Sequence, residues 1–368
     1  MKIALIITNL RGGGAEKALL QTALALRSHG HDARLVLLED LRQHAVPDEL
    51  PVYALGRPQA AISKGWLGKR LAAWRLRRRL AQLATDRPFD LLLSTLPFAD
   101  EVCRLAALPR HWMRIANTLS REIDGLRATA PRKAARRLAR YRQLYSGQNL
   151  IAVSRGVAND LPRNLGIQPG RIQVVPNPFD LERIRQLAKE ETPGLPTQPY
   201  GIHVGRFAKQ KRHDLLLAAW KQLPAPHLLI LLTDPCDELE RLIDAQGMKE
   251  RVRIAGFQTN PYPWIAGAAI LVLCSDHEGM PNVLVEALAC GTPVVATDCP
   301  SGPRELLAAE LPEALVPMND PDALAAGLRR MLARPRTAPL IELSGFAPGA
   351  TVAALERLST ARPPKEFP

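Results

Sequence analysis

The sequence predicts an α/β protein of two Rossmann-like domains, and three observations support this fold class. The first is length, because 368 residues exceed what one hydrophobic core usually supports. The second is the opening pattern, in which an apolar strand at residues 2–8 and a glycine-rich loop lead into a helix at 16–28 and a strand at 34–38. The third is a similar strand, helix and strand pattern at residues 270–297.

A proline cluster separates the two predicted domains. Pro193, Pro196 and Pro199 lie in the segment ETPGLPTQPY, which has the composition of a linker or hinge. We therefore expect an N-terminal domain, a C-terminal domain, and a final helix with a tail, at residues 1–190, 191–345 and 346–368.

Apolar runs of strand length continue through both domains and fit parallel strands buried on both faces. In the first domain they lie at residues 90–95, 112–116, 150–153 and 172–175. In the second domain they lie at residues 201–205, 227–233, 252–255, 270–274 and 293–297. Segments with helical spacing lie at residues 66–83, 215–223, 237–246, 283–290 and 350–358.

Positive charge is concentrated in the first half of the chain. The net charge is +13, but residues 1–180 hold 29 lysines and arginines against 14 acids, whereas the remainder holds 20 against 22. This asymmetry predicts an anionic partner for the first domain, which can be a lipid headgroup, a phosphorylated acceptor or nucleic acid. Nucleic acid ranks lowest, because no recognised nucleic-acid-binding motif is present and only 5% of the residues are aromatic.

Two segments carry most of this charge. Residues 64–79 hold seven basic residues and no acid, and a helix there aligns Leu67, Leu71 and Trp74. Such a helix can lie on an anionic membrane surface, or it can be a domain helix with a solvated basic face. Residues 127–142 again hold seven basic residues and no acid, which favours a patch built from both segments. The candidate patch for a membrane or an acceptor consists of Lys69, Arg70, Arg77, Arg78, Arg132, Lys133, Arg136 and Arg137.

Neither a metal site nor a membrane span is expected. The histidines lack the spacing of metal ligands, and the cysteines form no CxxC pair, which indicates a reducing compartment. No apolar run approaches the roughly 20 residues that cross a bilayer, and the first residues run directly into a strand, so we expect no secretion signal. The five cysteines are Cys103, Cys236, Cys274, Cys290 and Cys299.

The loop RGGGAEKA after the first strand partly matches the dinucleotide fingerprint GxGxxG. Gly12 and Gly14 fit, but Lys17 stands at the position of the third glycine. Glu39 and Asp40 end the second strand, where an acid binds ribose in dinucleotide enzymes. The loop and Glu39 therefore leave a nicotinamide-dependent oxidoreductase open as one possible function. The positive charge alone leaves a basic nucleic-acid-binding protein open as another.

The densest chemistry lies at residues 270–305, where Glu278 follows a strand and Glu286 lies early in the next helix. Ligands of open α/β sheets bind at the carboxyl ends of strands, where both acids are expected. Gly279 lets the backbone approach a ligand, and the start of the helix offers N–H groups to anions. Two carboxylates are pure acceptors and suit a hydroxyl-rich ligand. The alternative is an ordinary strand–helix–strand unit in which Glu286 is exposed to solvent on the helix.

Glu278 and Glu286 stand inside EGMPNVLVEALACGTPVVAT, which is followed by SGPRE and resembles the donor-site signature of retaining GT-B glycosyltransferases of family 4. The resemblance implies that Glu278 lies near the hydroxyls of the donor sugar and that Glu286 binds the ribose. VGRFAKQK resembles the diphosphate-binding segment and implies that role for Arg206 and Lys211. Backbone contacts to the donor are implied for Gly13, Gly14, Gly279, Met280, Pro281, Asn282 and Val283.

This sequence departs from the family pattern at two positions. Family members often have a catalytic histidine after the strand at residues 112–116, whereas Asn117 stands there and His111 precedes the strand. Asn117 can orient hydroxyl groups but does not titrate near neutral pH. Arg212 replaces a frequent glycine of the diphosphate-binding loop.

The resemblance implies a GT-B fold, with an acceptor-binding and a nucleotide-sugar-binding domain facing across a cleft and the final helix returning to the first domain. It implies retaining transfer of a hexose or N-acetylhexosamine from a nucleotide-sugar, expected to be a UDP-sugar, without metal or cofactor. The basic first domain favours a glycan or lipid-linked acceptor of cell-surface polysaccharide or lipopolysaccharide biosynthesis, with the enzyme cytoplasmic and peripheral on the inner face of the cell membrane. No nucleic-acid partner is expected.

Overall fold

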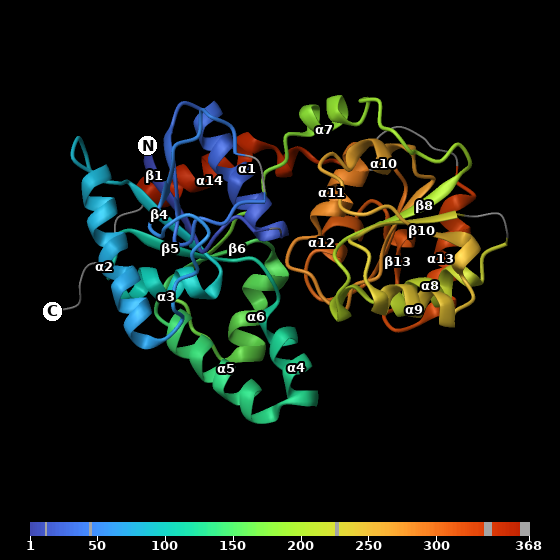
Figure 1. Ribbon diagram of the computed structural model, residues 1–368, viewed down its shortest axis with the longest axis horizontal. Coiled ribbons are helices and arrows are strands. Elements are labelled where there is room, and N and C mark those ends of the chain that lie inside the picture. The colour runs from blue at the N-terminus through green and yellow to red at the C-terminus, as the bar shows by residue number, and fades with distance from the viewer. Residues whose placement is uncertain (12, 44–45, 225–227, 335–340, 361–368) are drawn as a thin grey trace. The chain divides into compact units, whose positions relative to one another are not determined.

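The computed structural model describes residues 1–11, 13–43, 46–224, 228–334 and 341–360 (Figure 1). The chain divides into two compact units. Unit 1 comprises Met1–Pro178 together with the chain from Gly345 onward, and unit 2 comprises Phe179–Ser344. Gly12 and the end of the tail lie outside the described residues, as does the first residue of the strand expected at 227–233.

Unit 1 is built on a parallel sheet with the strand order β3-β2-β1-β4-β5-β6-β7 (Figure 1). Its strands are β1 (Lys2–Ile7), β2 (Asp32–Leu37), β3 (Val52–Ala54), β4 (Leu91–Thr95), β5 (His111–Ile115), β6 (Asn149–Ala152) and β7 (Arg171–Val174). Its helices are α1 (Gly14–Ser28), α2 (Trp66–Leu83), α3 (Pro97–Leu105), α4 (Leu119–Thr129), α5 (Pro131–Tyr145), α6 (Arg155–Leu165) and α14 (Pro348–Thr360).

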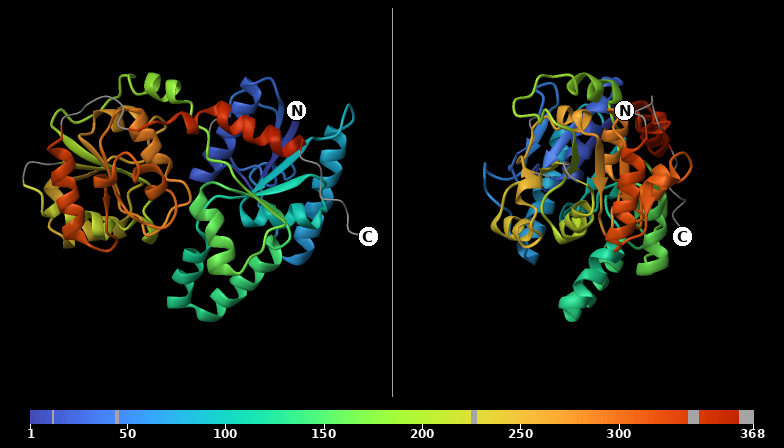
Figure 2. Two further views of the ribbon diagram at one scale, coloured as in Figure 1. Left: turned by 180° about the vertical axis from the view of Figure 1, so that it is seen from behind. Right: turned by 90° about the vertical axis from the view of Figure 1, so that its right-hand side faces the viewer.

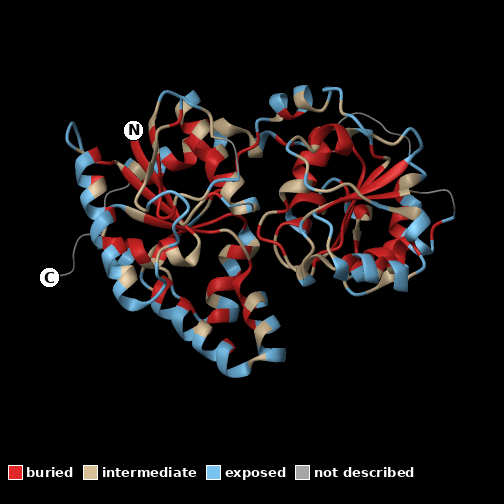
Figure 3. Cartoon of the chain, viewed as in Figure 1, coloured by how far each residue is buried: buried red, intermediate tan, exposed pale blue. Residues whose placement is uncertain are grey.

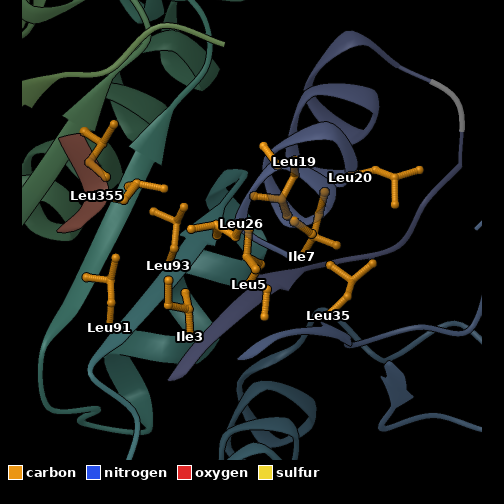
Figure 4. Packing of buried hydrophobic residues seen from close by; sticks show 14 of the residues in the cluster. Ile3, Leu5, Ile7, Leu19, Leu20, Leu26, Leu35, Leu91, Leu93 and Leu355 are labelled. Carbon is orange, nitrogen blue, oxygen red and sulfur yellow. The ribbon is translucent and has the colours of Figure 1, made fainter. Parts of the chain in front are cut away.

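The alternation of side chains along β1 gives unit 1 two hydrophobic cores. Ile3, Leu5 and Ile7 point to one face of the sheet, where α1 and α14 cover them, and Leu355 of α14 joins this cluster (Figure 4). Ala4 and Ile6 point to the opposite face, where the buried sides of α2 and α3 pack. The unit is therefore a three-layer sandwich with the sheet in the middle.

Unit 2 repeats this plan around a parallel sheet with the strand order β10-β9-β8-β11-β12-β13. Its strands are β8 (Tyr200–Val204), β9 (Leu228–Leu232), β10 (Val252–Ile254), β11 (Ile270–Leu273), β12 (Val294–Thr297) and β13 (Leu315–Val316). Its helices are α7 (Leu181–Leu187), α8 (His213–Lys221), α9 (Asp237–Ala245), α10 (Tyr262–Gly267), α11 (Asn282–Ala289), α12 (Pro303–Leu307) and α13 (Pro321–Leu332). Helix α8 packs against α13, and α7 and α10 pack against α11.

The two Rossmann-like α/β domains confirm the predicted fold class, and most predicted elements match to within a few residues. The basic segment at residues 127–142 includes the end of α4 and most of α5, two helices that pack side by side (Figure 2). Helix α4 ends at Thr129 and Pro131 opens α5, since proline lacks the N–H that a helix interior needs. The short strand β3 was not predicted. Within the described residues, no helix is long and apolar enough to cross a membrane.

Candidate active site

The predicted donor residues of unit 2 lie at the carboxyl edge of its sheet. The strand order reverses between the neighbours β8 and β11, so the connections that follow these strands diverge at that point. In an open parallel sheet this switch point is where ligands bind. The loop after β8 carries Arg206 and Lys211, and the loop after β11 carries Glu278, so both flank the switch point.

Lys211 and Glu278 form an ion pair that joins the two loops. The Lys211 Nζ donates a hydrogen bond to Glu278 Oε1 at 2.7 Å. Glu278 is 8% exposed and Lys211 is half-buried, so bulk water screens the pair only weakly. An ammonium group has three donors, so Lys211 can keep Glu278 and still donate to an anionic ligand oxygen.

Further hydrogen bonds between the two loops hold this pair in position. The Asp276 N–H donates to the Gln210 carbonyl at 2.8 Å, and Gln210 Nε2 donates to the His277 carbonyl at 2.6 Å. The Cys274 thiol donates to the Lys211 carbonyl at 3.1 Å. The Lys211 ammonium group is therefore held in a fixed position, and a cation fixed in this way can stabilise negative charge on a ligand.

Arg212 explains how the loop keeps its shape without the frequent glycine. Its φ is +50°, in the left-handed region that normally favours glycine. Its guanidinium donates to Asp214 at 2.9 Å and to Asp276 at 2.9 Å, and it also contacts Asn319. The hydrogen bond to Asp214 raises the pKa of Arg212 above its usual value. These contacts offset the backbone strain of about 1 kcal/mol or more.

Glu286 lies on the second turn of α11 and is 5% exposed. The Tyr262 hydroxyl, at the start of α10, donates to Glu286 Oε1 over 3.5 Å. The residues predicted to contact the donor through their backbone immediately precede α11 or form its first turn, at the positive end of the helix dipole. They are Gly279, Met280, Pro281, Asn282 and Val283.

Gly302 is a residue of this site that the sequence analysis missed. Its φ is +89°, and a Cβ atom there would lie 2.3 Å from Pro281 Cδ and 3.4 Å from the Gly279 carbonyl oxygen. The loop after β12 therefore presses against the loop before α11. The SGP turn was the available signal, since a glycine in a turn marks either positive φ or close backbone approach.

Two family models match the chain. The model described as Glycosyl transferases group 1 matches residues 198–334, and the model described as Glycosyltransferase Family 4 matches residues 12–183. The chain belongs to the family 4 glycosyltransferases. This confirms the resemblance that Glu278 and Glu286 carried.

The glycosyltransferase is 28% identical over 338 residues to the N-acetylgalactosamine-N,N'-diacetylbacillosaminyl-diphospho-undecaprenol 4-alpha-N-acetylgalactosaminyltransferase of Campylobacter jejuni, covering 90% of each chain. It is 31% identical over 165 residues to the lipopolysaccharide 1,6-galactosyltransferase of Escherichia coli, covering 43% of this chain and 45% of that one. Its structure resembles Anabaena HepE in complex with UDP and glucose, with a TM-score of 0.74, 21% identity, and 98% and 100% of the two chains covered. The two-domain α/β fold is therefore the GT-B fold.

Arg206 is one of the exposed residues among those predicted to bind the donor. It is exposed at the end of β8 and makes no ion pair with any residue that the structure describes. Its charge is therefore available to an anionic ligand at the carboxyl end of β8.

In unit 1 of the glycosyltransferase, the predicted residues lie at the carboxyl edge of the other sheet. Gly13 is the N-cap of α1 in an extended conformation, and Gly14 is the first residue of that helix. Asn117 follows β5, is half-buried, and accepts a hydrogen bond from the Thr118 N–H at 2.9 Å through Oδ1. Its Nδ2 group therefore carries the donor capacity that can orient a hydroxyl.

His111 does not take the place of the family histidine. It is the first residue of β5, so it lies at the amino end of the strand, away from the carboxyl edge. One ring nitrogen is 2.8 Å from Ser94 Oγ, and burial lowers the pKa of His111 to about 4. The imidazole is neutral near pH 7 and belongs to a buried network.

The carboxyl edge of unit 1 also holds a buried cation, Arg114. Its guanidinium contacts Asn177 Oδ1 and lies 3.5 Å from Thr95 Oγ1, and burial lowers the pKa of Arg114 to about 10. Asn177 belongs to the PNP turn, so Arg114 anchors that turn beneath the edge. Sequence reasoning gave no role to this arginine, because a strand residue at this position is expected to be apolar.

Glu39, which supported the oxidoreductase alternative, is engaged within unit 1. One carboxylate oxygen accepts from Asn9 Nδ2 at 2.7 Å and the other from the Ile62 N–H at 3.0 Å. The residue is buried. Both oxygens that would receive ribose hydroxyls are therefore bound to the protein itself.

The residues of the predicted basic patch divide into paired and exposed ones. Lys69 donates to Glu101 at 2.7 Å, and Arg137 pairs with Glu122. These two bonds join neighbouring helices of unit 1. The exposed members are Arg70, Arg77 and Arg78 of α2, and Arg132, Lys133 and Arg136 of α5.

Two histidines of unit 2, His203 and His213, pack against each other in its interior. The rings of His203 and His213 meet edge to face with 4.8 Å between centroids, and burial lowers the pKa of both, that of His213 to about 4. Across the described residues, no group of three or more His, Cys, Asp or Glu side chains could hold a metal ion.

Proposed function

We propose that this glycosyltransferase moves a hexose or N-acetylhexosamine from a UDP-sugar, with retention of anomeric configuration and without a metal. The acceptor is a glycan or lipid-linked intermediate of cell-surface polysaccharide or lipopolysaccharide biosynthesis at the inner face of the cell membrane. The observation that carries the proposal is the Lys211–Glu278 pair at the switch point of unit 2, with Glu286 on the helix that follows the loop of Glu278.

The chemistry of these groups suits a nucleotide-sugar. Glu278 accepts hydrogen bonds from sugar hydroxyls, and Glu286 accepts them from the ribose, because ionised carboxylates offer only acceptor sites. Lys211 and Arg206 neutralise the negative charge of the diphosphate, a role that a metal ion has in other transferases. HepE in Anabaena was solved with UDP and with UDP-glucose, which supports UDP as the nucleotide.

We propose retention through attack of the acceptor on the face of the sugar from which the diphosphate leaves. The bond between sugar C1 and the diphosphate oxygen breaks, UDP leaves with the bonding electrons, and the acceptor hydroxyl oxygen forms a new bond to C1 on the same face. The hydroxyl proton passes to the leaving diphosphate. Glu286 is occupied by ribose, so the two-carboxylate mechanism of retaining glycosidases is not required.

The acceptor class rests on charge and on the relatives. The Campylobacter jejuni relative is named for a diphospho-undecaprenol acceptor, and the Escherichia coli relative for lipopolysaccharide. The excess of basic residues in residues 1–180 suits an acceptor with phosphate groups or a position at an anionic leaflet.

The first test is a thermal shift experiment with UDP, GDP, ADP and NAD on the wild type and on Glu286→Ala. Ligand at 100 times its Kd adds roughly 2.7 kcal/mol to the free energy of unfolding of the part that binds it. We expect UDP to stabilise the wild type and not Glu286→Ala, while the exposed control Glu250→Ala keeps the full shift.

The outcomes discriminate between the proposed functions. Stabilisation by NAD but not by UDP or GDP would overturn the proposed UDP-sugar donor. Once a donor is found, the anomeric coupling constant of the product by NMR tests retention, and unchanged turnover in EDTA tests metal independence.

A further inference from the structure

Helix α2 exposes its largest apolar side chains. Trp66 is 65% exposed, Leu67 74%, Leu71 47% and Trp74 55%. These are four of the seven exposed large apolar side chains among the described residues. The residues that α2 buries against the sheet are smaller or lie later in the helix, namely Ala72, Ala73, Leu76, Leu80 and Leu83.

This arrangement is the reverse of what folding alone favours. Burying a leucine side chain contributes roughly 1.5–3 kcal/mol, so a domain helix normally turns such residues inward. An exposed cluster of two tryptophans and two leucines on one helix marks a surface that contacts something else. Figure 3 shows the outer side of α2 as exposed along its length.

Basic side chains interleave with the exposed aromatic rings. The Arg70 guanidinium lies 4.9 Å from the ring centroid of Trp66, and that of Arg78 lies 5.6 Å from Trp74. These cation–π contacts hold cations and rings side by side on the outer surface. Lys69, by contrast, turns inward to Glu101.

A groove of about 620 Å³ runs along this outer surface. Three arginines and no acid line it, and the end of α3 contributes the exposed Leu105. Arginine donors bind phosphate oxygens in a planar, often bidentate geometry. The full lining is Arg70, Ala73, Trp74, Arg77, Arg78, Ala81 and Leu105.

The second basic helix, α5, lacks these features. Its apolar side chains Tyr141, Leu144 and Tyr145 are buried, and its basic residues Arg137 and Arg140 pair with acids of neighbouring helices. Helix α5 is therefore a domain helix with a solvated basic face, whereas α2 carries apolar and basic groups outward together.

We propose that the outer face of α2 docks on an anionic phospholipid bilayer, with lipid phosphates in the arginine-lined groove and the tryptophans and leucines in the interfacial layer. Charge complementarity selects this occupant, because residues 64–79 hold seven basic residues and no acid. Tryptophan suits the membrane interface, where one part of the ring system is apolar and its N–H stays hydrated. The inference rests on the membrane-associated acceptor of the proposed function and names the surface that reaches the membrane.

The test is flotation of the full chain with vesicles of phosphatidylcholine, with and without phosphatidylglycerol, at low and high salt. We expect salt-sensitive binding to the anionic vesicles only. Each exposed cation near the surface contributes about fivefold to binding, so loss of three should weaken it at least tenfold. The charge variant is Arg70→Gln, Arg77→Gln and Arg78→Gln, and the apolar variant is Leu67→Ser, Leu71→Ser and Trp74→Ser.

The matched control removes three exposed charges from α5, through Arg132→Gln, Lys133→Gln and Arg136→Gln. We expect this variant to keep binding within about threefold of the wild type. An equal loss in the α5 variant, or full binding by the apolar variant, would overturn docking through α2 in favour of net charge alone. Conversion of a dimer to a monomer by the apolar variant would make the face a contact between two copies and would also overturn it.

Two further measurements separate the inference from its alternatives. Inorganic phosphate that blocks vesicle binding at millimolar concentration would show a site for free phosphate instead of a lipid surface. UDP binding, measured on each variant, reports on unit 2. In the charge and apolar variants, lost vesicle binding with intact UDP binding supports docking through α2. In the wild type, absent vesicle binding with intact UDP binding overturns only the docking surface, whereas absent UDP binding overturns the proposed donor.

Discussion

Two buried carboxylates, one in each unit, have different partners. Glu278 of unit 2 accepts from the ammonium of Lys211 at 2.7 Å. Asp100, the corresponding acid of unit 1, accepts only from hydroxyl groups among the described residues, those of Ser94 and of Tyr145 at 2.9 Å. Burial raises the pKa of Asp100 to about 7, because neutral hydroxyl groups do not compensate for the lost hydration of a charge.

The two units differ in how they arrange their buried polar and charged groups. Unit 2 keeps charged groups at the switch point, partly open, where a ligand can compete for them. Unit 1 seals its polar groups inside, including His111 and Arg114, and turns its uncompensated charge outward on α2 and α5. Unit 2 therefore presents a few charged groups in fixed positions, whereas the exposed charge of unit 1 lies on the outer faces of its helices.

Replacing Lys211 by methionine should have the largest effect on the donor side. Lys211 is bound to Glu278, the acid assigned to the sugar, so we expect its ammonium group to contact the β-phosphate that carries the sugar. Loss of a hydrogen bond between charged groups costs about 2–3 kcal/mol, so we expect UDP affinity by calorimetry to fall about 30- to 150-fold.

The controls for Lys211→Met are a second ligand, UMP, and a variant of a nearby residue. UMP lacks the β-phosphate, so its affinity should change less than threefold. Lys209→Met removes an exposed cation from the same loop and should leave both affinities unchanged. Equal weakening of UDP and UMP would mean that the loop has collapsed and that Lys211 does not contact the β-phosphate.

Gly302→Ala tests whether unit 2 depends on the close approach of two loops. The added Cβ would lie 2.3 Å from Pro281 Cδ on a backbone with φ of +89°, so both overlap and strain oppose it. We expect a loss of about 2 kcal/mol in the free energy of unfolding by urea, together with weaker UDP binding. Gly291→Ala has φ of +72° but no atom within 4 Å, so it carries strain without the overlap. Equal losses in the two variants would exclude the loop contact as the cause.

The sequence predicted the sheets and the donor motif because both depend on local patterns. Buried parallel strands read as apolar runs, and the helix at residues 66–83 was recognised by its spacing. Glu278 and Glu286 were found because the motif around them is long. Contacts between distant segments left no such pattern, which is why Gly302 and Arg114 were missed.

The direction in which a side chain points was the other limit. Lys69 and Arg70 are neighbours in one basic run, yet Lys69 turns to Glu101 and Arg70 stays exposed. The aligned Leu67, Leu71 and Trp74 could face the sheet or the solvent by periodicity alone, and the structure exposes all three. Packing against α3 decides between these faces, and the sequence of α2 does not contain that information.

The smallest effect is expected from Asp100→Asn, which tests the sealed network of unit 1. The pKa of Asp100 is about 7 in the folded state and near 3.8 when unfolded, so its contribution to stability is full below about pH 4 and is lost as pH rises toward 7. His111, whose pKa is lowered to about 4, acts in the opposite direction, but it is present in both proteins and cancels in their difference. The stability of Asp100→Asn relative to the wild type should therefore rise by about 1.4 kcal/mol from pH 5 to pH 6, measured by urea unfolding.

Glu49→Gln removes an exposed carboxylate of the same unit and should show no such rise. A pH-independent difference between Asp100→Asn and the wild type would show that Asp100 is already ionised at pH 5, and the contrast between the two buried acids would then disappear.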